Sequence, residues 1–319
     1  MHALKPSART TAPRPRARTP WRLAATIGLL ALGLTAGTLP PASAATPAPA
    51  ARATVTTPTA VLPAPAVQYS SSPKACTVSL SPAERATLLK ASDTSTLREV
   101  PDALARIKTI NSILAVRGDA RGTFPVFYEV ILERTLHVMS TEHFNDPVWS
   151  KKIALEFVSE YLRNLHGHLS GGKVTAYWKD FYTLAAGCKN STGRLAAQAL
   201  VTHMVDDFPR ALLAVGTKAT DQADFLHYGD ALIEATPTIV ERIKRYYGAD
   251  LQPLFSLYLL GELFGPSRVT TAFFTTVRGL AWTNFTVLQS SPIMGNAKIT
   301  FYWTTASTLM LGYELRGML

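Results

Sequence analysis

The sequence predicts an all-α fold, a multi-helix bundle that forms a single domain over residues 74–319. Apolar side chains recur along this stretch at the three- and four-residue spacing of amphipathic helices. No series of alternating, strand-like segments stands among them. A stretch of about 245 residues is also long enough to bury one substantial core.

The first helices are predicted from local signals. The run Ser81-Pro82-Ala83-Glu84 has the form of a capping box with proline at the first helical position. Further helices are expected over residues 101–116, 124–139, 147–165, 174–186 and 192–208. The glycines of residues 166–172 are expected to break the helix, which would leave His166 and His168 in an exposed loop.

Pro209 is expected to end the helix before it, because proline lacks the backbone donor that a helix interior needs. A long helix over residues 221–247 is expected to kink at Pro237, and apolar helices to follow over 251–264 and 267–288. The last segment, 299–311, is rich in Thr, Tyr and Trp and fits either strand or helix.

The first 44 residues have the pattern of a secretory signal peptide. Arginines without acidic residues precede an apolar stretch over 23–37, and Ala42 and Ala44 occupy the small positions of a cleavage site. We therefore expect a secreted, extracellular protein without a stable membrane span after cleavage; a retained membrane anchor is the alternative. Residues 45–73, rich in Ala, Pro and Thr, are expected to form a disordered linker.

The charge of the chain lies partly in this leader. Six of the 32 basic residues and none of the 22 acidic ones fall within the first 44, so cleavage lowers the net charge from +10 to +4. No other block of Lys or Arg is present, and we expect no nucleic-acid partner.

Both cysteines, Cys76 and Cys188, lie in the part that would be exported, where thiols commonly pair. Two cysteines allow one intramolecular disulfide, which would tie the start of the domain to its middle. Two unrelated buried thiols are the alternative.

The candidate chemistry centres on residues 199–216. His203 and Asp207 lie four residues apart and would share one helix face, with Asp206 beside them. Their neighbours are apolar, so an imidazole and a carboxylate placed there need each other, a metal ion or a ligand. The pair suits metal ligation or acid–base chemistry, and a mutually satisfied buried pair is the alternative.

The common enzyme motifs are missing. The chain has no H-E-x-x-H zinc motif, no G-x-S-x-G nucleophile turn, no phosphate-binding glycine loop and no dinucleotide fingerprint. His227, with Asp230 three residues on, is the candidate third metal ligand, against the alternative of a capping or core histidine. The line formed by Glu129, Glu133 and His137 is more typical of a solvated helix face.

Arg278 and Trp282 are also four residues apart in an apolar helix, so the guanidinium is expected to lie over the indole. A buried arginine needs a carboxylate, and we expect Arg278 to pair with Asp206 or Asp207. In this arrangement Arg278 orients Asp207 or binds an anionic group, and Asp206 and Trp282 contact the ligand.

Several patterns resemble, in their order along the chain, the family known as domain of unknown function 5995. They span residues 123–288 and are Phe124-x-x-x-Tyr128, Phe144-x-Asp146-Pro147, the Phe157–Tyr161 pair, Trp178, His203-x-x-x-Asp207-x-Pro209 and Arg278-x-x-x-Trp282. The resemblance implies a helical domain and no particular reaction. It supports the site residues and adds Tyr128, Tyr161 and Trp178 as candidate ligand-binding residues.

The segment from His203 to Asp207 also resembles, more distantly, one in zinc-dependent phospholipase C and the related single-strand-specific nucleases. The histidine that should follow is replaced here by the region of Arg210.

Two main functions therefore compete. The first is a metal-assisted hydrolase in which a divalent metal such as zinc is bound by His203, Asp207 and His227, and Arg278 assists. The second is a non-enzymatic binding module for a hydrophobic or lipid-like ligand, with the His-Asp-Arg cluster as a structural network. A purely structural envelope protein is a third. The hydrolase predicts a water-accessible cleft at His203, and the binding module predicts a dry cavity with the cluster sealed.

Overall fold

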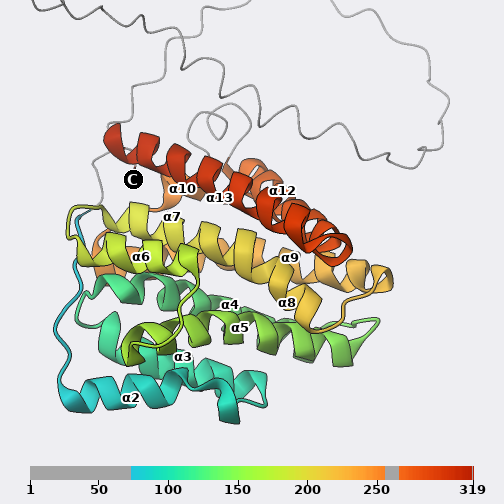
Figure 1. Ribbon diagram of the computed structural model, residues 1–319, viewed down its shortest axis with the longest axis horizontal. Helices are drawn as coiled ribbons and strands as arrows, with labels where there is room; N and C mark the ends of the chain where they lie inside the picture. The colour runs from blue at the N-terminus through green and yellow to red at the C-terminus, as the bar shows by residue number, and fades with distance from the viewer. Residues whose placement is uncertain (1–72, 256–265, 318) are drawn as a thin grey trace, which may run out of the picture. The chain divides into compact units, whose positions relative to one another are not determined.

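The computed structural model describes residues 73–255, 266–317 and 319, which form the predicted all-α bundle (Figure 1). Within this part of the chain there is no strand, and only isolated bridges join Lys74 to Ser191 and Cys76 to Asp119. The described residues belong to one compact unit. The predicted leader and all of the predicted linker except residue 73 lie outside them. None of the described helices is long and apolar enough to cross a membrane.

The first helices begin where their capping signals stand. Helix α2 (Pro82–Ser92) starts with the predicted capping box, in which Ser81 and Glu84 bond each other's backbone N–H. The following helices agree with the apolar periodicity: α3 (Val100–Leu114), α4 (Thr123–Thr141), α5 (Pro147–Ser170) and α6 (Ala176–Ala186). Short 3-10 turns lie at Thr94–Thr96, Ala120–Gly122 and Ala219–Asp221.

The predicted break at residues 166–168 is wrong, because α5 continues to Ser170 and ends at Gly171, whose φ is 76°. Contacts with other helices hold its last turn. His166 Nδ1 lies 3.2 Å from the Ser92 hydroxyl, and His168 stacks on Tyr182 with ring centres 3.9 Å apart. Gly167 permits a close approach by the Lys173 carbonyl, which a β-carbon would meet. The two histidines are thus half-buried helix residues.

Pro209 does not end its helix either. Helix α7 (Thr192–Thr202) runs into a π-helical turn (His203–Asp207) and continues as α8 (Phe208–Ala214). In the wide turn the Phe208 N–H bonds the carbonyl of His203, five residues back. Pro209 stands in the first turn of α8, directly after the wide turn, and the chain stays helical past it.

The second half is helical to its end. Helix α9 (Gln222–Tyr247) passes through Pro237 and stops at Gly248, whose φ is 65°. Of the predicted helix over 251–264, α10 (Gln252–Phe255) is described and the rest lies outside the described residues. Helix α12 (Pro266–Ser290) is followed by α13 (Pro292–Leu315). The segment 299–311, for which strand and helix were both expected, is therefore helical.

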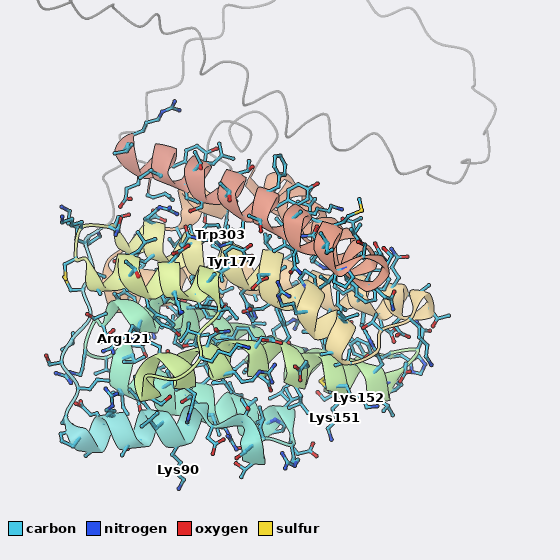
Figure 2. The ribbon with its side chains drawn as sticks, viewed as in Figure 1. Lys90, Arg121, Lys151, Lys152, Tyr177 and Trp303 are labelled. Atoms are coloured by element: carbon cyan, nitrogen blue, oxygen red, sulfur yellow. A yellow bond between two sulfur atoms is a disulfide. The ribbon has the colours of Figure 1, made fainter. Side chains whose placement is uncertain are left out.

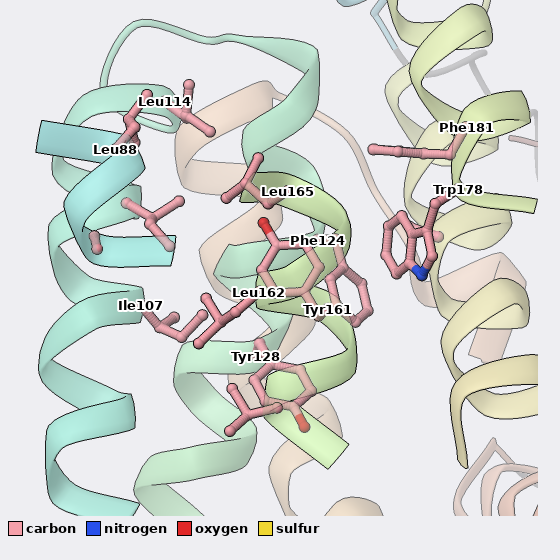
Figure 3. Close-up of a cluster of buried hydrophobic side chains, with 14 of the residues drawn as sticks. Leu88, Ile107, Leu114, Phe124, Tyr128, Tyr161, Leu162, Leu165, Trp178 and Phe181 are labelled. Atoms are coloured by element: carbon pink, nitrogen blue, oxygen red, sulfur yellow. The ribbon is translucent and has the colours of Figure 1, made fainter. Parts of the chain in front are cut away.

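Helix α7 and the π turn are the centre of the packing. Leu195 and Ala199 contact a core built around Phe124, Tyr161 and Trp178, shown in Figure 3. Leu200 and Met204 contact a second core between α4, α8, α9 and α12. The third face of α7 packs on α13. A polar group placed in the π turn is therefore enclosed from several sides.

The predicted disulfide is confirmed. Cys76 and Cys188 are bonded, with their Cα atoms 4.5 Å apart across a sequence separation of 112. The segment that contains Cys76 is also fixed by Asp119, which accepts the Val78 N–H at 2.8 Å and the Arg121 Nε–H at 2.9 Å.

Candidate functional site

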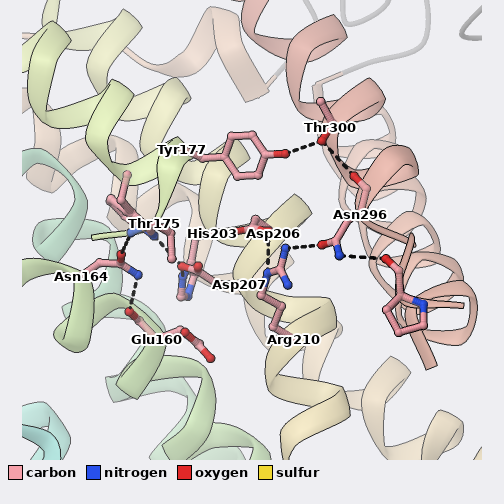
Figure 4. Close-up of polar contacts among 12 residues, drawn as sticks. Glu160, Asn164, Thr175, Tyr177, His203, Asp206, Asp207, Arg210, Asn296 and Thr300 are labelled. Atoms are coloured by element: carbon pink, nitrogen blue, oxygen red, sulfur yellow. Dashed lines mark hydrogen bonds and ion pairs between the residues drawn. The ribbon is translucent and has the colours of Figure 1, made fainter. Parts of the chain in front are cut away.

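Asp207 is the hydrogen-bonding centre of the candidate site (Figure 4). Its Oδ2 accepts from Trp178 Nε1 at 2.8 Å and lies 2.8 Å from His203 Nδ1. The predicted pairing of His203 with Asp207 is thus present, and Trp178 is joined to it from α6. His203 and Asp207 are each 1% exposed, so both groups are sealed from solvent in this conformation.

Aromatic rings from three helices surround His203. Phe157 stacks on the imidazole with ring centres 3.7 Å apart and an interplanar angle of 14°. Phe124 and Tyr128 meet it edge-on at 4.9 and 5.0 Å. Tyr161 stands one layer further out, 5.4 Å from Trp178. The structure therefore places Tyr128 and Trp178 near the imidazole of His203, and Tyr161 against the indole of Trp178.

This setting favours the neutral forms of both titrating groups. Burial raises the pKa of Asp207 to about 7, although the hydrogen bond from Trp178 opposes the rise. Burial lowers the pKa of His203 well below its usual value, against the effect of the nearby Glu160 carboxylate. Near neutral pH the site therefore holds an uncharged imidazole beside a carboxyl group whose pKa is close to the pH.

Several polar atoms of this region have no hydrogen-bond partner among the described residues. They include His203 Nε2, Asp207 Oδ1 and the hydroxyls of Tyr161 and Tyr182. An unsatisfied buried polar group costs about 1–3 kcal/mol. Because several of them gather in one aromatic core, this region is the candidate functional site of the described part of the chain.

A small cavity lies beside His203. Its volume is about 10 Å³, room for about one water molecule. The wall is apolar and comes from α4, α5, α7, α9 and α10, with contributions from Phe124, Phe127, Phe157, Leu200, Ile239 and Phe255. Among the described residues His203 is 1% exposed, and no open cleft reaches it there.

Asp206 faces away from this core. Its Oδ1 accepts from Arg210 Nε at 2.8 Å, and Arg210 also bonds Asn296 of α13 (Figure 4). Burial raises the pKa of Asp206 to about 6, and the neighbouring Asp207 adds to the rise while Arg210 opposes it. Arg210 was not among the predicted partners, although its i, i+4 spacing from Asp206 is a signal for such a pair.

The predicted ion pair of Arg278 with Asp206 or Asp207 is wrong. Arg278 donates to the carbonyls of Phe225 and Leu226, and its Cζ lies 5.4 Å from the centre of the Phe225 ring. The described carboxylates of the π turn are bonded to other groups. Trp282 packs on Phe225 as well, with ring centres 5.1 Å apart, so both residues belong to the α9–α12 contact.

His227 does not join the site. Its Nε2 lies 2.8 Å from a carboxylate oxygen of Glu142, and its ring meets Phe144 edge-on at 5.0 Å. In the described part of the chain no three His, Cys, Asp or Glu side chains converge as metal ligands would. The predicted metal set is therefore wrong in its third ligand, because α9 directs His227 toward the end of α4.

The line on α4 is a set of ion pairs between helices. Arg242 of α9 binds Glu129 at 2.8 Å and Glu133 at 2.7 Å, and Lys108 of α3 also reaches Glu133. His137 is exposed. These contacts are half-exposed, so their role is to join three helices at the surface.

Comparison with known proteins supports the resemblance read from the sequence motifs. A family model described as Family of unknown function (DUF5995) matches residues 100–308, from the start of α3 into α13. No curated protein and no solved structure matches the chain. The match includes the π turn and the rings around it, and the comparisons give no support to the likeness to phospholipase C and the nucleases.

Proposed function

We propose that this chain, which belongs to the Family of unknown function (DUF5995), is an exported, non-enzymatic binding protein for an apolar, lipid-like ligand. His203, Asp207 and Trp178 form its structural polar core. The observation that carries the proposal is the enclosed cavity that apolar side chains and His203 line, beside a His–Asp pair that is sealed from water.

The sealed pair argues against hydrolysis in this conformation. A hydrolase must bring water to its base, and a metal-assisted one needs a third ligand. His203 is 1% exposed, stacked under Phe157 and bonded to Asp207. A fully buried, hydrogen-bonded pair of this kind fixes the register of the helices it joins, here α6 and the π turn.

The cavity supports the choice of ligand. Ligand pockets are lined mainly by apolar and aromatic side chains, with few polar groups. The cavity holds about one water molecule, so a lipid-like ligand enters only if a wall moves. Phe255 forms one wall from α10, and Phe127 of α4 is its neighbour at 6.1 Å between ring centres. This wall is the side where we place the ligand.

The test is a titration of the full chain with cis-parinaric acid, a fluorescent fatty acid. Ile239→Phe fills the cavity from α9 and should weaken binding by about tenfold or more. Leu226→Phe adds similar bulk at an exposed position of the same helix and should leave the affinity unchanged. Saturable binding that Ile239→Phe weakens supports the proposal, and equal binding by both variants contradicts it.

The hydrolase is the second candidate. It is favoured by the unpartnered His203 Nε2 and Asp207 Oδ1 and by the π-helical turn that holds them, a geometry common at functional sites. Elemental analysis of purified protein, beside a His203→Ala/Asp207→Ala variant, separates the two functions. A stoichiometric metal that the variant loses would establish the metalloenzyme and overturn the binding module.

A further inference from the structure

The hairpin of α12 and α13 carries few charged side chains. Residues 266–315 include only the charged residues Arg268, Arg278, Lys298 and Glu314. Of the described side chains among these, Arg278 is buried, Glu314 accepts the Ser191 N–H, and Lys298 lies over the ring of Tyr302. The far side of the domain carries exposed lysines, such as those labelled on α2 and α5 in Figure 2.

The exposed positions of α13 follow the heptad spacing of a coiled coil. This heptad stripe consists of Met294, Ala297, Phe301, Thr304, Thr308, Leu311 and Leu315, all of them exposed. Phe301 is 61% exposed and Leu315 is 79% exposed. Burial of large apolar side chains is favourable. Side chains spaced alternately three and four residues apart form a stripe along which a second helix can pack.

The threonines of the hairpin present an apolar surface too. Thr283, Thr286 and Thr308 each donate their hydroxyl to a carbonyl of their own helix, three or four residues back. Thr300 and Thr305 do the same. Because these hydroxyls are already bonded within the helix, a partner can cover these five side chains without leaving their hydroxyl donors unpaired.

We infer that the heptad stripe of α13, together with the exposed side of α12, is the interface between two copies of this chain. The heptad stripe contains no charged side chain, so like-charged copies do not repel each other along it, and it presents no cation of its own to a nucleic acid or an acidic protein. A helix of 24 residues is about 36 Å long and about 10 Å wide. Adding the part of α12 from residue 276 gives roughly 600 Å² per copy, or about 1,200 Å² in all, the lower limit for a specific dimer.

The stripe is also complementary to itself. In an antiparallel pair about a twofold axis near the middle of α13, Phe301 of one copy meets Thr304 of the other, a large side chain against a small one. Met294 then meets Leu311, and Ala297 meets Thr308. A twofold contact uses the same patch on both copies, and it requires this kind of self-complementarity. The dimer should form with micromolar affinity because its area is modest.

Sedimentation of the full chain over about 1–200 μM tests the inference directly, because a micromolar dimer shifts mass within that range. The average mass should rise from 34.6 kDa toward twice that value. Phe301→Lys should keep the chain monomeric throughout, with an unchanged helical circular-dichroism spectrum. Val116→Lys replaces an equally exposed apolar residue outside the hairpin and should dimerise like the original chain.

Cysteine crosslinking locates the contact. Thr304 lies near the twofold axis, so Thr304→Cys should form a disulfide-linked dimer under mild oxidation. Thr87 on α2 is exposed and donates to the carbonyl four residues back, which makes Thr87→Cys the matched control that should not crosslink. A monomeric chain at 200 μM overturns the inference. Binding of that monomer to phosphatidylcholine vesicles, lost in Phe301→Lys, would assign the face to lipid instead.

Discussion

The guanidinium of Arg278 occupies the space in which residue 229 would carry a β-carbon. A methyl group built on Gly229 would overlap Nη1 and Cζ of Arg278, which crosses from α12 to reach backbone carbonyls of α9. Helices α9 and α12 are therefore held together by an arginine that only a glycine admits.

Gly229→Ala should destabilise the domain by about 2–3 kcal/mol, because the methyl group displaces the buried Arg278 from its carbonyl partners. Urea unfolding measures the loss. Gly279 is the matched control, since nothing lies within 4 Å of its β-carbon position. Gly279→Ala should leave stability unchanged or raise it by up to about 1 kcal/mol, because alanine is the better helix former. Equal losses in the two variants would contradict the contact.

Trp178→Phe should destabilise the domain by about 2–4 kcal/mol, because it removes both buried volume and the N–H that Asp207 accepts. Chemical denaturation is the measurement. Tyr177 is the neighbouring aromatic residue of α6, and its hydroxyl bonds Thr300 at an exposed position. Tyr177→Phe should therefore change stability by less than about 0.5 kcal/mol. Similar effects of both changes would contradict a stabilising role for Trp178 at Asp207.

The buried carboxyl groups of the π turn predict a dependence of stability on pH. Burial raises the pKa of Asp207 to about 7 from its ordinary 3.8, so the folded chain keeps a proton that the unfolded chain releases between these values. The contribution of Asp207 to the free energy of unfolding therefore falls as pH rises from about 4 to about 7. Asp207→Asn removes this fall, and its stability relative to the original chain should increase with pH across that window.

Asp206→Asn should also gain stability relative to the original chain as pH rises, but over a narrower pH range. Its pKa is raised by burial to about 6, so the relative gain should end near pH 6. Guanidinium unfolding at half-unit steps of pH separates the two curves. A difference between either variant and the original chain that does not change with pH would refute the corresponding assignment.

His168 should act in the opposite direction. Burial lowers the pKa of His168 to about 4, with Arg121 adding to the effect, so the unfolded chain binds a proton that the folded chain excludes between pH 4 and 6.5. Its contribution to stability therefore grows as pH rises through this range. His168→Phe keeps a ring against Tyr182 and should make the domain less sensitive to acid, as thermal unfolding at pH 4.5 and 7 would reveal.

Removing the disulfide should cost about 2–5 kcal/mol, because the bond closes a long loop of the unfolded chain. The double variant Cys76→Ser/Cys188→Ser and the reduced original chain should lose the same amount in urea. A stable reduced chain would mean that the Asp119 contacts alone hold the first segment.

Features set by neighbouring residues could be predicted from the sequence. The capping box at Ser81, the i, i+4 pairing of His203 with Asp207 and the only disulfide that two cysteines allow all rest on local spacing or counting. For the threonine-rich segment 299–311, the sequence was compatible with either a strand or a helix. It is a helix because its inner side packs on α7, and its threonine hydroxyls bond carbonyls of the same helix.

Features that depend on distant residues could not be predicted. Trp178 donates to Asp207 across 29 positions, and no spacing rule connects them. Arg278 was expected at a carboxylate, yet backbone carbonyls and the Phe225 ring surround it because α12 lies against α9 at that point. The glycine-rich sequence around His166 and His168 is typical of a loop, but contacts with α2 and α6 hold both residues in a helix.

The π turn amounts to one residue more than a regular helix would need between α7 and α8. Each residue of an α-helix advances its face by about 100°. In a regular helix this extra residue would turn everything beyond it by that angle, so that the carboxylate would point away from the indole of Trp178 and Phe208 away from Phe157, but the wide turn absorbs the residue instead. The His–Asp pair and the second core thus depend on the wide turn, and the backbone geometry at this point is as constrained as the composition.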